Sequence, residues 1–186
     1  MRETSLSPVW GSLITPAMLR ILLLTFASVA AAAFSADEEG FTSLFNGKDL
    51  GGWKGPVENY EVKDGAIVCK AGKGGTIYTT EEYADFVVRL EVKIPAGCNN
   101  GLAIRYPGGG DTAYVGMCEL QVLDNDAPKY ARLDPRQCHG SAYGKVNMDE
   151  VMGKKPHPGK DRTSGYFGLA GHNDLVLFRN VRIKRL

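Results

Sequence analysis

Hydrophobic and polar residues alternate along most of the chain after residue 40, and the alternation is interrupted at Gly, Asn, Asp and Pro. A period of two is typical of strands that bury one face. Because almost no helical periodicity is present, the pattern predicts an all-β sandwich or barrel. We expect strands at residues 42–45, 59–62, 66–70, 76–79, 85–94, 101–106, 114–123, 165–170 and 175–184.

Segment 85–94 shows the alternation most clearly, with apolar residues at the even positions from Phe86 to Ile94. A tight turn is expected at Asp64-Gly65, between two of the short strands. Residues 124–164 differ, because they are polar and rich in Pro and Gly. A loop of that length in a small domain is either functional or a sign that strands are missing.

The predicted strand 114–123 carries two polar residues in its middle, Glu119 and Gln121. They share one face, while Leu120 and Val122 point to the other face and into the presumed core. A carboxylate beside an amide on a rigid strand favours a ligand-facing surface over a purely structural one.

The N-terminus has the organisation of a secretory signal peptide. Arg20 precedes an apolar run at 21–30, and the small residues 31–33 follow it. We therefore expect residues 1–36 to be a signal peptide and 37–186 to be the mature domain, secreted or periplasmic in a bacterium. The apolar run is short for a membrane span, which needs roughly 20 residues. An uncleaved anchor helix is the alternative.

Charge and cysteine content limit the function further. Beyond residue 36 the chain has 20 basic and 20 acidic residues, so no basic surface for nucleic acid or an anionic membrane is expected. A neutral ligand fits this balance better. Four cysteines, at 69, 98, 118 and 138, permit disulfides in an exported chain and allow three pairings. Some of them could equally be small buried hydrophobic residues.

Three further residues are candidates for the site, and each has a structural alternative. Arg105 follows the turn Asn99-Asn100-Gly101 and could instead pair with Glu119 across neighbouring strands. His139 lies in a loop, where its ring could bond backbone groups. His172 is interpreted mainly as part of a turn, because Asn173 and Asp174 follow it.

If Arg105, Glu119, Gln121 and His139 converge, they suit a polyhydroxylated ligand, since they supply directional donors and acceptors. They also suit proton abstraction next to a carbonyl, with Glu119 or His139 as the base and Arg105 as the oxyanion partner. A divalent metal could bind Glu119, His139 and Asp124, although no motif spacing requires one. Asp124 is otherwise expected to fix its loop through Asx-type hydrogen bonds. Glu119 has no clear carboxylate partner for ordinary glycoside hydrolysis.

Several blocks of residues, in order along 40–186, resemble the 3-keto-disaccharide hydrolase domain family. These blocks are Gly40–Leu50 with Gly52-Trp53, Glu82–Phe86, Asn99–Gly101, Arg105, Glu119–Asp124, His139–Gly144, Gly168–His172 and Phe178–Ile183.

The resemblance implies a concanavalin A-like jelly-roll sandwich that acts on sugars whose C3 hydroxyl has been oxidised to a ketone. It implies Glu119, His139 and Arg105 as catalytic candidates, and Gln121, Asn100, Asp124 and Tyr143 as substrate contacts. A non-catalytic carbohydrate-binding module on the same scaffold is the alternative.

The chain departs from the family between Lys145 and Lys160, where family members carry further strands. Removing such strands should expose sheet edges and apolar surface.

Overall fold

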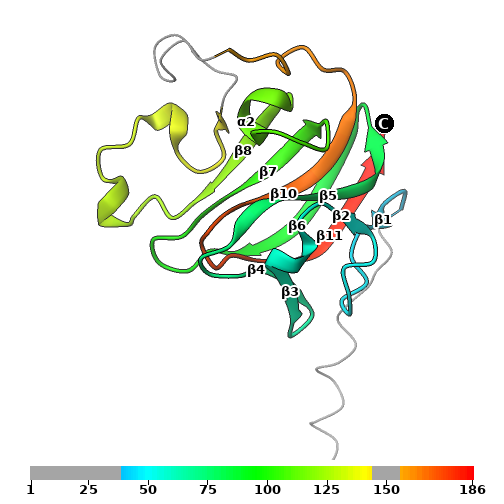
Figure 1. The fold of residues 1–186 in the computed structure, drawn as a ribbon, viewed down its shortest axis with the longest axis horizontal. Coiled ribbons are helices and arrows are strands. Elements are labelled where there is room, and N and C mark those ends of the chain that lie inside the picture. The colour runs from blue at the N-terminus through cyan, green and yellow to red at the C-terminus, as the bar shows by residue number, and fades with distance from the viewer. Residues whose placement is uncertain (1–38, 144–155) are drawn as a thin grey trace, which may run out of the picture. The chain divides into compact units, whose positions relative to one another are not determined.

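The computed structural model describes residues 39–143 and 156–186, whose strands form two antiparallel sheets (Figure 1). The described sandwich lies within Gly40–Leu186. The expected signal peptide, 1–36, lies outside the described residues, so its presence and its cleavage stay predictions. In the described part of the chain, no helix is long and apolar enough to cross a membrane.

The first sheet, called sheet A here, is centred on the last strand of the chain. Its strands are β1 (Thr42–Ser43), β3 (Tyr60–Lys63), β4 (Ala66–Cys69), β6 (Phe86–Lys93) and β11 (Leu177–Arg185). Strand β11 pairs with β1, β4 and β6, and β3 extends the sheet from β4. The β3–β4 turn has positive φ angles at Asp64 (51°) and Gly65 (72°), which confirms the predicted tight turn.

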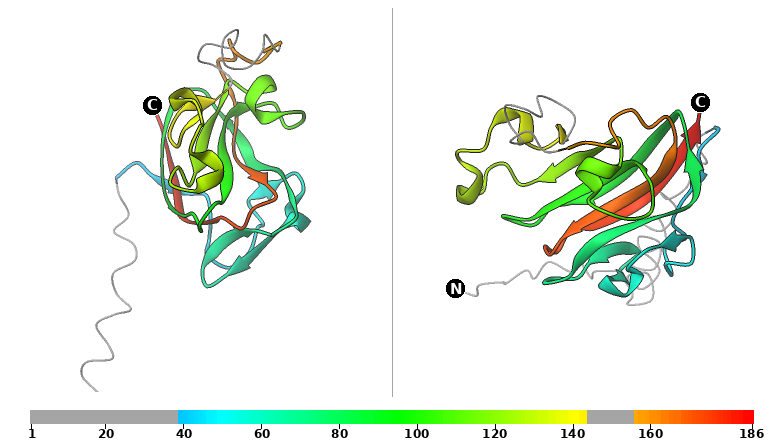
Figure 2. Two further views of the ribbon diagram at one scale, coloured as in Figure 1. Left: turned by 90° about the vertical axis from the view of Figure 1, so that its left-hand side faces the viewer. Right: turned by 45° about the horizontal axis from the view of Figure 1, so that its top comes forward.

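The second sheet, called sheet B, holds the polar strand identified from the sequence. Its strands are β2 (Trp53–Lys54), β5 (Gly74–Tyr83), β7 (Asn99–Tyr106), β8 (Cys118–Leu123), β9 (Ala142–Tyr143) and β10 (Gly165–His172). The order is β2-β5-β10-β7-β8-β9. The right-hand view of Figure 2 shows β5, β10, β7 and β8 side by side. Strand β10 therefore brings a late segment of the chain between two early ones.

The core lies between the two sheets and is built from the apolar faces that the alternation predicted. Its largest fully buried side chains include Phe167 and Leu169 from β10 and Phe178 from β11. The ring of Phe86 on β6 packs edge-on against that of Phe167, with centroids 6.3 Å apart. Strand β10 contributes side chains to both faces of sheet B, so it forms part of the core and part of the outer surface.

Most strands lie where the alternation predicted them, with two corrections. The strand expected at 114–123 begins only at Cys118, because Thr112–Val115 forms the short helix α2. The Asp111 side chain caps this helix by accepting a hydrogen bond from the Ala113 N–H at 3.1 Å. The two-residue strands β2 and β9 were missed, since alternation cannot be seen in so short a segment. The segment after β8 contains the 3-10 helices Pro128–Tyr130 and Pro135–Gln137.

All four cysteines are free thiols in the structure. Cys69 and Cys118 are buried, which supports the interpretation of these two as small hydrophobic residues. Burial raises the pKa of the Cys69 thiol, so its nucleophilic thiolate form is disfavoured.

Replacing Phe167 tests how strongly the core depends on β10. We expect Phe167→Ala to lower the free energy of unfolding by about 3–5 kcal/mol, because it removes a fully buried ring and leaves a cavity. Urea unfolding measures this change. Leu175→Ala is the matched control, since Leu175 is exposed and its loss should change stability by no more than about 0.5 kcal/mol. Equal effects of the two substitutions would contradict this packing.

Candidate functional site

Glu119 and Gln121 of β8 lie on the outer face of sheet B, as their spacing predicted. In the strand pairing, Glu119 is opposite Ala103 on one side and Tyr143 on the other, and Gln121 is opposite Gly101. Directly paired residues point to the same face, so Tyr143 shares this surface. Glu119 is only 3% exposed and Gln121 only 8%. Burial of two polar side chains away from the core is unusual for a structural strand.

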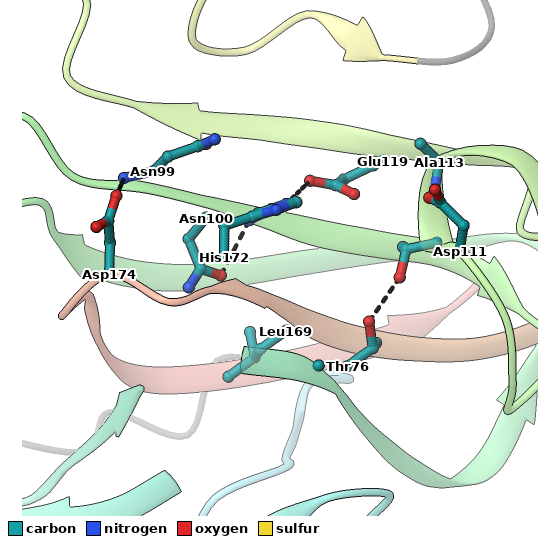
Figure 3. A network of polar contacts seen from close by, with 12 residues as sticks. Thr76, Asn99, Asn100, Asp111, Ala113, Glu119, Leu169, His172 and Asp174 are labelled. Atoms are coloured by element: carbon teal, nitrogen blue, oxygen red, sulfur yellow. Dashed lines mark hydrogen bonds and ion pairs between the residues drawn. The ribbon is translucent and has the colours of Figure 1, made fainter. Parts of the chain in front are cut away.

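The Glu119 side chain reaches across the neighbouring strand β7 to bond His172 at the end of β10 (Figure 3). The distance from His172 Nε2 to Glu119 Oε1 is 2.7 Å. Gly101 on β7 makes this reach possible, because a Cβ atom at position 101 would overlap the Glu119 carboxyl group. The missing side chain at Gly101 therefore permits the contact between β8 and β10.

The two partners differ in exposure, and this difference separates their roles. The Glu119 side chain is 4% exposed, whereas that of His172 is 42% exposed. A carboxylate can only accept a hydrogen bond, so Nε2 of His172 carries the proton that the two groups share. The other ring nitrogen, Nδ1, is then available to a ligand. The hydrogen bond to Glu119 raises the pKa of His172, with burial opposing it and the charges of Glu119, Asp111 and Asp174 adding to it.

A groove of about 470 Å³ runs over this face and contains the pair. One part of the lining is Glu119, His172, Ala170 and Gly171, and the rest comes from Gly55, Pro56, Gly75, Thr76, Tyr78, Tyr106, Gly108, Gly109, Gly110, Asp111 and Thr112. Helix α2 lies over the β7 and β8 side of the sheet in Figure 1. Small residues thus form the floor, and aromatic and acidic side chains form the walls.

Arg105 does not join this site, which corrects the expectation that it shares a face with Glu119. Its φ angle is +49°, at a bulge where the pairing of β7 with β10 shifts register. Its guanidinium donates to Asp85 at 2.8 Å and to the carbonyl oxygens of Ala84 and Arg162. The bulge turns the side chain toward the cavity that Cys118 and Leu120 line, on the opposite face of β8. Arg105 therefore holds segments of the sandwich together, and its partner is Asp85 rather than Glu119.

His139 and Asp124 are used to fix their loop. The Nδ1 atom of His139 accepts a hydrogen bond from the Leu123 N–H at 3.2 Å, which agrees with the structural alternative for this residue. Asp124 accepts from the Gly97 N–H at 2.7 Å and from the Asp126 N–H, the Asx-type arrangement expected for it. Among residues 39–143 and 156–186, no three metal-ligating side chains gather, so Glu119, His139 and Asp124 do not form the metal site that the sequence left possible.

Asn100 also points away from the groove. It is fully buried and pairs with Val122, so its side chain lies on the core side of sheet B. Its Oδ1 accepts a hydrogen bond from the Gly101 N–H at 2.9 Å, which ties it to the backbone of β7. Asn100 is thus a structural residue beneath the site and not a surface contact.

His172 is the site residue that sequence reasoning assigned to a turn. Local composition favoured this assignment, because Asn173 with φ of +68° does begin a turn directly after it. The signal that could have found it is the alternation of Gly168, Ala170 and His172 on one face of β10. On one face of a strand, two small residues followed by a histidine indicate an open surface beside a functional side chain.

Comparison with known proteins identifies the family to which this chain belongs. Residues 40–158 match the model of the 3-keto-alpha-glucoside-1,2-lyase-like domain family. The chain belongs to this family, which confirms the resemblance seen in the sequence.

A curated relative is the 3-keto-disaccharide hydrolase of Bacteroides thetaiotaomicron. It is 26% identical, with 88% of this chain and 84% of the relative covered. That alignment spans 244 residues, more than the 186 of this chain, which agrees with the expected loss of a segment. Its place between Lys145 and Lys160 stays a prediction, because most of those residues lie outside the described part.

Solved structures support the same fold. Two Parabacteroides distasonis crystal structures assigned as glycosyl hydrolases superpose with TM-scores of 0.66 and 0.65. The first is 22% identical, with 78% of this chain and 99% of that chain covered. The second is 25% identical, with 80% and 94% covered. These matches confirm the sandwich architecture predicted from the alternation.

Replacing Gly101 tests whether this position permits the contact between Glu119 and His172. We expect Gly101→Ala to displace the carboxylate and to lower the pKa of His172 toward its ordinary value of 6.5. Overpacking should also cost about 1–3 kcal/mol of stability in urea unfolding. The control is Gly109→Ala on the rim of the same groove, where an added Cβ meets no atom within 4 Å. An unchanged His172 pKa in Gly101→Ala would contradict the role given to Gly101.

The charge state of His172 provides an independent test. NMR titration should place the His172 pKa above 6.5, and Glu119→Gln should lower it, because the substitution removes the anionic partner. A raised folded-state pKa stabilises the fold most below pH 6.5, and the contribution is lost as pH rises through the folded-state pKa. A His172 pKa that is the same in both proteins would show that the pair does not form in solution.

Proposed function

We propose that this protein cleaves the glycosidic bond of a sugar that carries a ketone at C3. His172 is the general base, and Glu119 is the carboxylate that assists it. The observation that carries the proposal is the buried Glu119 carboxylate, which bonds Nε2 of the half-exposed His172 imidazole in the lining of the groove. Membership in a family whose curated relative is a 3-keto-disaccharide hydrolase supports the choice of substrate.

The chemistry follows from the ketone. A C3 ketone acidifies the hydrogen at C2, and His172 Nδ1 takes this proton while the electron pair moves onto the C3 oxygen. The resulting enediolate collapses, a C1–C2 double bond forms, and the bond from C1 to the leaving oxygen breaks. The imidazolium returns its proton to that oxygen. Water then adds at C1, and a proton from solvent adds at C2.

The role of Glu119 is to make His172 a stronger base and to orient it. Its carboxylate stabilises the imidazolium that forms during proton abstraction, which is the same interaction that raises the pKa of His172. Gln121 and Tyr143 lie on the same face of sheet B as Glu119, beside the groove and not in its lining, and their polar groups are of the kind that recognise sugar oxygens. Proton transfer and recognition thus come from neighbouring positions of one rigid sheet.

The walls of the groove suit the faces of a sugar ring. Tyr78 packs on Tyr106 and Tyr166, with ring centroids 5.6 and 5.0 Å away. Tyr78 and Tyr106 line the groove together with Glu119 and His172. Aromatic rings offer an apolar face to the C–H groups of a sugar while the acidic wall accepts from its hydroxyls. A glycoside with two sugars could therefore contact both parts of the groove.

Turnover of an aryl 3-keto-glucoside tests the proposal. We expect release of the phenol, and a reduction in kcat of about 100- to 10,000-fold in Glu119→Gln and His172→Gln, because each removes part of the general base. The matching unoxidised aryl glucoside should be inert, since its C2 hydrogen is not acidic. His139→Gln is the control variant and should retain activity, because the His139 ring bonds the backbone N–H of Leu123 at the end of β8 and does not line the groove.

Two outcomes would contradict this assignment. Loss of activity in His139→Gln with full activity in His172→Gln would return the base to His139. Saturable sugar binding without turnover would favour the alternative, a carbohydrate-binding module. The specific observation behind that alternative is the shortness of the chain relative to its curated relative.

A further inference from the structure

Strand β6 forms one edge of sheet A, and its outer side is unoccupied by any described strand. It pairs with β11 from Phe86 opposite Arg185 to Lys93 opposite Leu177, with a register shift in β11 between Arg179 and Arg182, opposite Leu90. Within residues 39–143 and 156–186, β6 has no second strand partner. An eight-residue edge with alternating apolar residues offers a row of backbone donors and acceptors to another strand.

The apolar side chains beside this edge are incompletely covered. The core-facing residues of β6, at positions 86, 88, 90 and 92, are all only partly buried. A cavity of about 530 Å³ opens next to them, lined mainly by apolar groups that include Phe86, Val88, Leu120 and Ala142. Two of the three exposed large hydrophobic residues in the described chain, Val87 and Leu186, lie at the same end of β6. A strand added to β6 would cover this cavity with its own core-facing side chains.

The charges on the solvent face of β6 are complementary to a second copy of β6. In an antiparallel pair centred on Leu90, Arg89 lies opposite Glu91 of the partner subunit, and the relation repeats by symmetry. Val88 then lies opposite Val92 of the partner subunit, and positions 87–93 of the two copies are all paired. Centring the pair on Arg89 or on Glu91 instead would set like charges opposite each other. The sequence of β6 therefore favours one symmetric register.

We propose that this protein forms a homodimer through antiparallel pairing of β6 with β6 of a second copy, centred on Leu90. The dimer joins the two copies of sheet A into one continuous sheet, the isologous arrangement that a two-fold axis requires. The interface is separate from the proposed catalytic residues, because Glu119 and His172 belong to sheet B.

Light scattering after size-exclusion chromatography of the purified full chain tests the dimer. We expect a dimer whose dissociation constant rises at least about tenfold in Arg89→Glu, since two symmetric attractive pairs become repulsive. The triple exchange Arg89→Glu, Glu91→Arg and Arg179→Glu should restore dimerisation, because Arg179 holds Glu91 at 2.7 Å within the same copy and must change with it. Glu61→Arg is the control, because it reverses an exposed charge on β3, at another edge of the same sheet. Thermal unfolding should show that each variant is folded.

Cysteine cross-linking tests the register itself. Leu90→Cys should form a disulfide between two copies under mild oxidation, identified by peptide mapping, because position 90 lies opposite itself. Val92→Cys should not link to itself, because it lies opposite position 88. A monomer at all concentrations up to about 100 µM, or a dimer that Arg89→Glu leaves unchanged, would overturn the proposal.

Discussion

The hydrogen bond between Glu119 and His172 is the interaction on which the outer face of sheet B depends. It joins β8 to β10 across β7, over the only kind of residue that leaves the path open, a glycine. A buried carboxylate without such a partner would be costly, so the pair explains why Glu119 can be nearly inaccessible. The same bond sets the protonation and the orientation of the exposed imidazole. The stability of this face and the proposed chemistry therefore depend on the same contact.

The fold supplies what this contact requires. Strand β10 places Phe167 and Leu169 in the core and Gly168, Ala170 and His172 on the outer face. Packing of the first set fixes the position of the second, since a strand alternates its side chains. Core packing therefore determines the geometry of the groove, and a rigid sheet positions the proposed base more precisely than a flexible loop would.

Period-two alternation was enough to predict an all-β sandwich or barrel, the core-facing side of β6 and the shared face of Glu119 and Gln121, and the family resemblance selected the sandwich. It could not predict Arg105, because a bulge with positive φ reverses the side to which that residue points. It missed His172 for a different reason. The contact joins residues 53 positions apart, while the local sequence around His172 shows only turn chemistry. His139 is a residue type that can act as a base, but its Nδ1 atom accepts a hydrogen bond from the backbone N–H of Leu123.

In the proposed reaction the glycosidic bond breaks by removal of the C2 proton, and solvent deuterium incorporation is a direct test of this step. When an aryl 3-keto-glucoside is cleaved in D₂O, the account predicts deuterium at C2 of the released sugar at the rate of phenol release. An incubation without enzyme corrects for spontaneous exchange. Release of a sugar that retains its original hydrogen at C2 would contradict the account.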